Sequence, residues 1–315
     1  MKKTFLILVT FLIYSCSNQF MTSENFEIHF EDVNNFWNVY DKVNLVNEDK
    51  IRIEIIEKEY FEKASKGLKL LIKKDGLTPL NFNEFIKDTV FFNSIRETTL
   101  KIEKDKSKIR KQIRSVQDLY PKARFSNIYF VVGQNFHGGT VLNNQMILEI
   151  QKNSKTENTK SEIIYKNNFK GMNDYNSLIP LIIHEQAHIF QKNNNKRNLL
   201  SKTISEGSAD FVMFLVTNKI TSFLKETYEY GEKNEYHLWE KFKTDMNRDY
   251  NSIQKNWFYN YNRKDLPPDL GYFVGFKISE KFYNESKNKA KALEFLLDIK
   301  NYEEILNKSK YNGGK

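Results

Sequence analysis

The chain has 315 residues, a formal net charge of +9 and a hydrophobic fraction of 40%. This length and composition fit one large domain, or a helical lobe joined to a second lobe, rather than a disordered chain. The excess of Lys and Arg is spread along the chain with acids between the bases. No nucleic-acid-binding motif accompanies it, so we expect no nucleic-acid partner.

The first twenty residues, MKKTFLILVTFLIYSCSNQF, have the order of an export signal. Lys2 and Lys3 precede an apolar run that is too short to span a bilayer. Cys16, the only cysteine of the chain, follows in IYSC, which resembles a bacterial lipobox. We expect residues 1–15 to be a lipoprotein signal peptide, Cys16 to be lipidated, and 16–25 to be a tether. The alternative is an ordinary signal peptide with an incidental cysteine.

The segment 26–120 has the pattern of a helical N-terminal region. Apolar residues recur at intervals of three and four, as in Tyr60, Ala64, Leu68 and Leu71. Pro121 ends this pattern. No apolar run after the leader approaches the ~20 residues that a membrane-spanning helix needs.

The region 121–315 begins with strand patterns and continues with helical ones. SNIYFVVG predicts a short strand, and TVLNNQMILEI predicts two more around Asn143-Asn144. A loop rich in Lys and Asn, at about 152–171, follows. The fold class is therefore α+β and mostly helical, with helices expected at 177–192, 206–217, about 235–246, 270–284, 288–299 and 301–308.

The stretch LIIHEQAHIFQ contains two of the five histidines of the chain. The surrounding helix is apolar on nearly all sides and should be buried. His184 and His188 are four residues apart and share one face, so both can bind one metal ion. Glu185 lies about 100° away, beside the ion, where it can act as a general base. The alternative is two polar residues caught in a buried helix, at a cost of roughly 2–7 kcal/mol for each unpaired polar group.

A catalytic zinc ion needs a third protein ligand. Glu206 lies 18 residues after His188, in TISEGSADFVMF, and Asp210 follows four residues later. Glu206 is the expected third ligand, and Asp210 is the expected hydrogen-bond acceptor for a ligating histidine. The alternative for Glu206 is an acid near a helix N-terminus, stabilised by the helix dipole.

HEQAH followed by EGSAD resembles the gluzincin branch of zinc metallopeptidases. NIYFVVG, GGT, HEQAHIFQ, EGSADF and GYFVGFKISEKFY also occur in an order that resembles a family of predicted zinc-dependent proteases. That family is related to the gliding-motility lipoprotein GldB of Bacteroidota, and the resemblance covers about residues 120–310. It implies a zincin-like catalytic lobe in 121–315, with a small β-sheet packed on the HExxH helix.

The implied chemistry is peptide hydrolysis by one Zn²⁺ per chain, held by His184, His188 and Glu206. Zinc activates water, and Glu185 removes its proton. By resemblance, residues 139–142 form the edge strand that binds an extended peptide.

A side chain from another element usually stabilises the oxyanion. Tyr272 is the first choice and His237 the second. The strong alternatives are that Tyr272 is a core aromatic residue and that His237 is a surface residue. His137 either lines the cleft or is a turn histidine.

These inferences predict a lipid-anchored zinc metallopeptidase of the cell envelope, at the outer membrane and facing the periplasm, with a peptide or protein substrate. The alternative is a non-catalytic envelope lipoprotein that uses the same scaffold for binding or assembly, as a relation to gliding motility suggests. A purely structural zinc ion fits less well, because such sites usually have four protein ligands, often cysteines, and residues 17–315 contain none.

Overall fold

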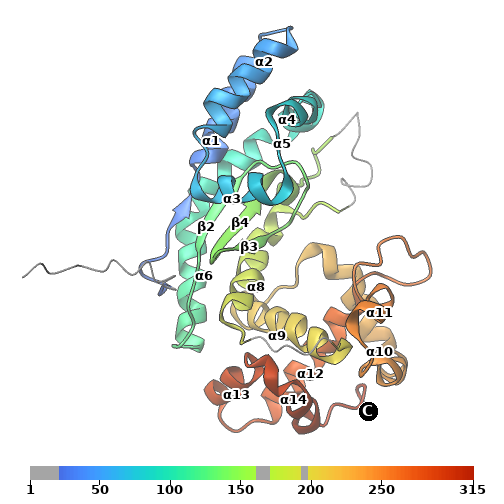
Figure 1. Ribbon diagram of the computed structural model, residues 1–315. Helices are drawn as coiled ribbons and strands as arrows, with labels where there is room; N and C mark the ends of the chain where they lie inside the picture. Colours follow the sequence, from blue (N-terminus) through green and yellow to red (C-terminus); the bar gives the residue numbers. More distant parts are fainter. Residues whose placement is uncertain (1–20, 161–170, 193–197) are drawn as a thin grey trace, which may run out of the picture.

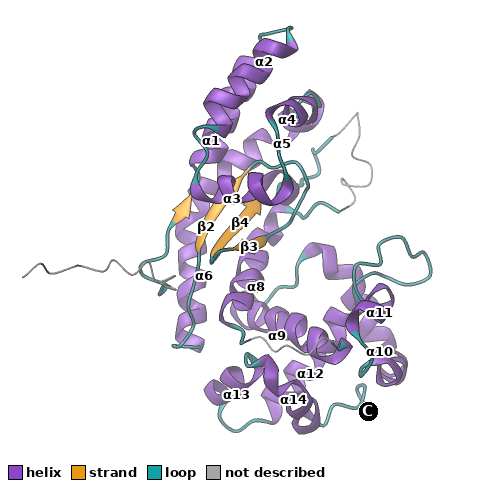
Figure 2. Ribbon diagram, in the orientation of Figure 1, coloured by secondary structure: helices purple, strands orange, loops and turns teal. Residues whose placement is uncertain are grey.

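The computed structural model describes residues 21–160, 171–192 and 198–315. The described chain is mostly helical, with a small four-stranded sheet in its upper part (Figures 1 and 2). The strands are β1 (Ile28–His29), β2 (Asn127–Val131), β3 (Thr140–Leu142) and β4 (Gln145–Glu149). The predicted α+β, mostly helical class is confirmed.

The sheet has the order β1-β2-β4-β3, with β1, β2 and β4 parallel and β3 antiparallel to β4. Asn143 and Asn144 both have positive φ, 48° and 57°, and join β3 to β4. Asparagine tolerates this conformation, which a two-residue hairpin turn requires. The two strands predicted around this pair are therefore present. β1 was not predicted.

Six helices form the N-terminal region, and the first and third of them contact the sheet directly. They are α1 (Glu31–Val43), α2 (Asp49–Ile56), α3 (Lys66–Asp75), α4 (Pro79–Phe85), α5 (Thr89–Lys101) and α6 (Lys106–Leu119). Local signals fix several ends: Ser65 caps α3 through the Leu68 N–H, and Gly76, with φ 64°, ends it. One hydrophobic core joins these helices to β2, β4 and α8 (Leu178–Phe190), so 26–120 and the start of 121–315 share their interior.

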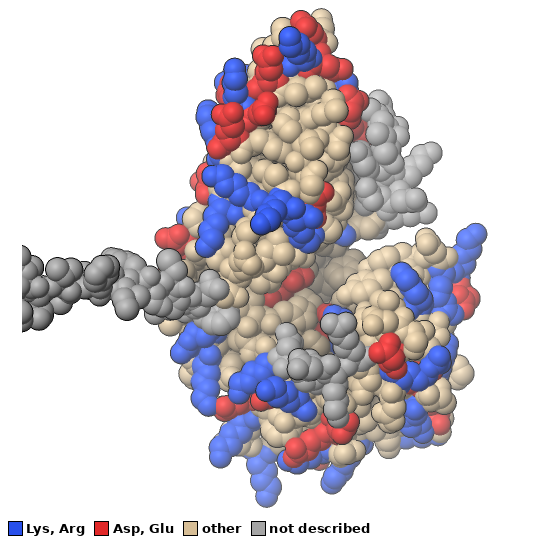
Figure 3. Space-filling view, in the orientation of Figure 1, with Lys and Arg blue, Asp and Glu red and all other residues tan. Residues whose placement is uncertain are grey.

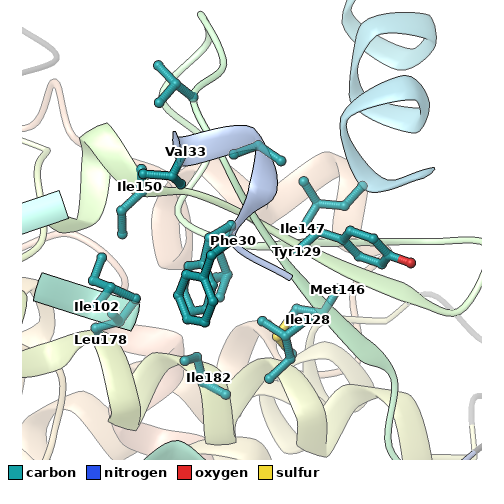
Figure 4. Close-up of a cluster of buried hydrophobic side chains, with 14 of the residues drawn as sticks. Phe30, Val33, Ile102, Ile128, Tyr129, Met146, Ile147, Ile150, Leu178 and Ile182 are labelled. Carbon is teal, nitrogen blue, oxygen red and sulfur yellow. The ribbon is translucent and has the colours of Figure 1, made fainter. Parts of the chain in front are cut away.

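Both faces of the sheet are covered, because every residue of β2 and β4 is buried. Ile128 and Met146 lie beside Phe30 and face Ile182 of α8 (Figure 4). Gln186 fixes α8 to the sheet: its Oε1 accepts from the Ser126 N–H at 3.0 Å, and its Nε2 donates to the Ser126 carbonyl at 3.1 Å. α8 is thereby held in register beneath the sheet.

The remaining helices form the lower part of the molecule in Figure 1. A second hydrophobic core lies among them and includes residues of α9. They are α9 (Leu199–Thr217), α10 (Lys225–Asp245), α11 (Tyr250–Trp257), α12 (Leu270–Glu285), α13 (Lys289–Leu296) and α14 (Tyr302–Ser309). α9 begins seven residues before the predicted start at 206, because Asn198 caps it through the Ser201 N–H. α11 was not predicted.

α9 packs on both α8 and α12, and therefore connects the two cores. α9 and α12 approach each other most closely at two glycines. A Cβ on Gly207 would lie only 2.0 Å from the Gly275 carbonyl carbon. The two backbones touch, which fixes α12 relative to α9. Figure 3 shows a hollow between the upper and lower parts of the molecule, and basic and acidic side chains mixed over this face.

Candidate metal centre

His184 and His188 on α8 meet Glu206 on α9. His184 Nε2 is 3.1 Å from His188 Nε2 and 3.4 Å from Glu206 Oε2, and His188 Nε2 is 3.3 Å from the same oxygen. Two ligands of a tetrahedral zinc ion, with bonds of about 2.0–2.1 Å, lie roughly 3.3 Å apart. The three donor atoms therefore have the spacing of one face of a zinc tetrahedron.

Each imidazole is oriented by a partner on its Nδ1. His184 Nδ1 lies 2.7 Å from Asp210 Oδ1, and Tyr228 donates to the other oxygen of Asp210 at 2.7 Å. A carboxylate can only accept here, so Nδ1 of His184 carries the hydrogen. This leaves its Nε2 to face the site.

His188 is oriented through Gln191. The Gln191 amide nitrogen donates to the Ser205 carbonyl at 2.7 Å and to Ser208 Oγ at 3.0 Å. The amide oxygen must then point toward His188 Nδ1, which lies 2.8 Å away. His188 thus also donates from Nδ1 and turns Nε2 to the site. The partners on α9 that orient Gln191 lie on either side of Glu206.

The carboxylates of Asp210 and Glu206 favour a positive charge among the ligand side chains. Burial alone lowers the pKa of His184, but Asp210 and Glu206 outweigh burial and hold that pKa well above its usual value. Burial raises the pKa of Glu206, whereas Lys202, His188 and His184 outweigh this and hold it well below its usual value. A cation bound at Nε2 of His184 would balance the negative charge of these carboxylates, as a proton does.

Lys202 pairs with Glu206 Oε1, the oxygen that does not face the histidines. This leaves Oε2 as the single metal-facing oxygen. Glu206 lies two turns into α9, not in its first turn, so stabilisation by the helix dipole does not explain it. The donor set, two imidazoles and one carboxylate, is that of a catalytic zinc site, and these residues fit the ion.

Glu185 lies beside the three ligands and beneath the segment that leads into β3. A Cβ on Gly139 would lie 2.9 Å from Glu185 Cγ, so glycine is required for this close approach. Among the described residues, none forms a hydrogen bond or ion pair with the Glu185 carboxylate, which is half-buried. The acid is thus placed at the site and is not committed to a structural role there.

Tyr272 lies at the site and His237 does not. The Tyr272 ring is 6.1 Å from the His184 ring between centroids, and burial and then Glu206 raise its pKa well above the usual value. His237 is on the exposed face of α10. His137 contacts Lys74 and Asp75. Cys16 and the leader lie outside the described residues.

Sequence reasoning missed Tyr259. It lies near Tyr272 and Glu206, and burial and then Glu206 raise the pKa of its phenol. It has a positive φ of 53° in the loop before α12. No signal in the sequence could have found it, since the loop that carries it has no motif. Gln191, in contrast, was within HEQAHIFQ, at a helical spacing of three from His188.

The family model for gliding motility protein GldB matches residues 32–313. The chain belongs to the GldB family. The predicted relation is confirmed, and the match extends over the N-terminal helices as well as the motif-bearing region. No curated protein and no solved structure matches the chain.

Family membership supports a gliding-motility lipoprotein of the cell envelope. None of the helices in the described ranges combines the length and the apolar character that a bilayer-spanning segment needs.

Proposed function

We propose that the protein is a zinc-dependent peptidase of the cell envelope, with zinc held by His184, His188 and Glu206. The observation that carries the proposal is the spacing of the three donor atoms, 3.1–3.4 Å from one another, with both Nδ1 atoms committed elsewhere. We infer a zincin-like lobe from the same elements, since α8 lies beneath a small sheet and α9 supplies the third ligand.

When bound, zinc polarises a carbonyl group and makes water acidic near neutral pH. Glu185 accepts a proton from the attacking water and gives it to the leaving nitrogen. Its lack of a fixed partner among the described residues leaves it able to move between these two positions. Tyr272 and the neighbouring Tyr259 offer phenol hydrogens to the oxygen that becomes negative.

β3 is the proposed binding edge for an extended peptide. It pairs with β4 on one side, is half-exposed, and follows Gly139, which contacts Glu185. A peptide that paired with β3 would cross the site beside the general base. Its main chain would provide most of the affinity, and the side chains along it the selectivity.

Membrane attachment through a lipidated Cys16 is part of the proposal, with the body on the periplasmic side of the outer membrane. Met21 pairs with Phe125 and Ser23 is buried, so residues 21–25 of the tether predicted at 16–25 belong to the folded body. The tether is therefore shorter than predicted, and the site would stay near the lipid surface. Substrates would then be proteins or peptides of the envelope.

Family membership favours a second function, a non-catalytic lipoprotein that binds or assembles other envelope proteins. A binding module of this kind can keep the fold and even the zinc ion, but it has no chemical need for Glu185. The two functions therefore differ most clearly at this residue.

The test begins with the zinc content of the purified protein, with His184→Ala as control. We expect about one zinc at this site, lost in the control. Glu185→Gln should then retain zinc and the fold but lose cleavage of a fluorogenic peptide library. Zinc binding with no cleavage by the unaltered protein would favour the binding module, and cleavage by Glu185→Gln would eliminate the general-base role.

A further inference from the structure

A second group of potential metal ligands lies outside the site described above. Asp75 ends α3, His137 lies in the loop between β2 and β3, and Glu149 ends β4. One donor atom from each lies within 4.8 Å of the others. The group forms at the carboxyl ends of β2 and β4, where chain segments far apart in sequence converge.

The contacts of His137 conflict with one another. Its Nε2 is 3.1 Å from the ammonium of Lys74 and 3.2 Å from Asp75 Oδ2. If Nε2 carries a hydrogen, that hydrogen competes with the Lys74 ammonium, because both are donors. If Nε2 carries a lone pair, it faces the lone pairs of Asp75. No protonation state of His137 satisfies both neighbours.

A divalent cation beside Nε2 of His137 and Oδ2 of Asp75, with the Lys74 ammonium displaced, resolves this conflict. The lone pairs of Nε2 and Oδ2 would then point at the ion, and their separation of 3.2 Å is close to the roughly 3.3 Å expected of two zinc ligands. Lys74 also contacts Asp75 Oδ1 at 2.9 Å. Its side chain is 34% exposed, so it can swing into solvent.

The burial of the Asp75 and Glu149 carboxylates favours a cation beside them. The Asp75 side chain is only 5% exposed, and its Oδ2 has no hydrogen-bond partner among the described atoms. Glu149 is buried and accepts from the backbone N–H groups of Phe136 and His137 and from Gln151 Nε2. Its Oε1 accepts only one of these bonds and retains a lone pair. Access comes from His137, whose side chain is 36% exposed.

We propose that Asp75, His137 and Glu149 form a second site for a divalent first-row cation such as Zn²⁺, with Lys74 as a displaceable competitor. One imidazole and two carboxylates suit such an ion better than Ca²⁺ or Mg²⁺, which prefer oxygen ligands alone. The site does not depend on the proposed peptidase activity. Its location suggests a role, because it would tie down the loop that leads from His137 to Gly139, above Glu185.

The test uses the full-length protein in detergent, with the first site removed by His184→Ala and His188→Ala. Zn²⁺ is added as the probe, free metal is removed by gel filtration, and bound metal is counted by mass spectrometry. Affinity is measured by competition with a chromophoric chelator. We expect one zinc per chain in this background.

Two substitutions in that background give opposite predictions. His137→Gln removes a ligand, and should weaken binding by more than the 10–100-fold typical of an outer-shell change. Lys74→Met keeps the length of the side chain but removes the competing ammonium, and should tighten binding by about tenfold. A simple ion-pair network, without a metal, predicts no zinc in any of these proteins.

The same substitutions in the otherwise unaltered protein provide a second readout if the double histidine variant fails to fold. There, His137→Gln should lower the zinc content from two to one. The second site would be overturned if the zinc content stays the same in His137→Gln. It would also be overturned if Lys74→Met leaves the zinc affinity unchanged. If the unaltered protein and the double histidine variant each hold one zinc, the first site binds none, and the proposed function alone would fail.

Discussion

The contact between Gly207 and Gly275 predicts a large effect from one methyl group. A Cβ on Gly275 would lie 1.9 Å from the Thr203 carbonyl oxygen and 3.0 Å from Gly207 Cα. These neighbours are backbone atoms of α9 and cannot rotate away. The helices would have to move apart by about 1 Å before the shorter contact reached 3.0 Å, and overpacking of this kind costs typically 1–3 kcal/mol.

We therefore expect Gly275→Ala to lower the unfolding free energy by about 3 kcal/mol, the upper end of that range. For a chain of this length, this corresponds to a fall in Tm of roughly 5 °C. Circular dichroism during heating provides the measurement. Moving α9 and α12 apart should also disturb the metal centre, because Gly207 follows Glu206 and Gly275 lies one turn after Tyr272.

Gly138→Ala is the matched control. A Cβ there would have Asn173 Nδ2 as its nearest neighbour, at an ordinary 3.5 Å. We expect a change within about 0.5 kcal/mol. If Gly275→Ala melts at the same temperature as Gly138→Ala, the direct contact between α9 and α12 is wrong.

Three further substitutions test the site and the core. Gly139→Ala should displace Glu185 and lower any peptidase rate by up to about 100-fold while zinc content stays constant, and an unchanged rate would contradict their contact. Asp210→Asn should weaken zinc binding about 10–100-fold, measured by chelator competition, because His184 loses a charged acceptor; equal affinity would remove Asp210 from that role. Burial raises the pKa of Asp32 from 3.8 to about 6, so the native state binds the extra proton and loses stability as pH rises through this window. The unfolding free energy of Asp32→Asn, relative to that of the unaltered protein, should therefore rise between about pH 4 and 6 by on the order of 3 kcal/mol. Urea denaturation measures this difference, and a difference that stays constant across this range would refute the pKa shift.

The sequence allowed prediction of the elements whose signals are local. The run around HEQAH ends close to the bounds of α8, and Asn143-Asn144 marks the turn between β3 and β4. β1 could not be predicted, because it has two residues and exists only through its pairing with β2, about a hundred residues away in sequence.

The site was predictable to the same extent. His184, Glu185 and His188 follow from one helical turn. Glu206 was singled out by its distance from that turn, although its helix begins earlier than expected. Tyr228 and Tyr259 escaped notice because α10 and the loop before α12 reach the site only through the packing of α9 against α12. Local periodicity has no information on that packing.

Two parts of the site require different explanations. A bound metal ion explains why His184, His188 and Glu206 converge and why their partners fix both imidazoles. It does not explain Glu185, which is placed beside the ligands without a hydrogen-bond partner among the described residues, nor the glycine that approaches it. A metal-binding scaffold could replace both residues without losing its ion, whereas hydrolysis requires a mobile base and room beside it. Glu185 and Gly139 are therefore the residues at which a peptidase and a binding module make opposite predictions.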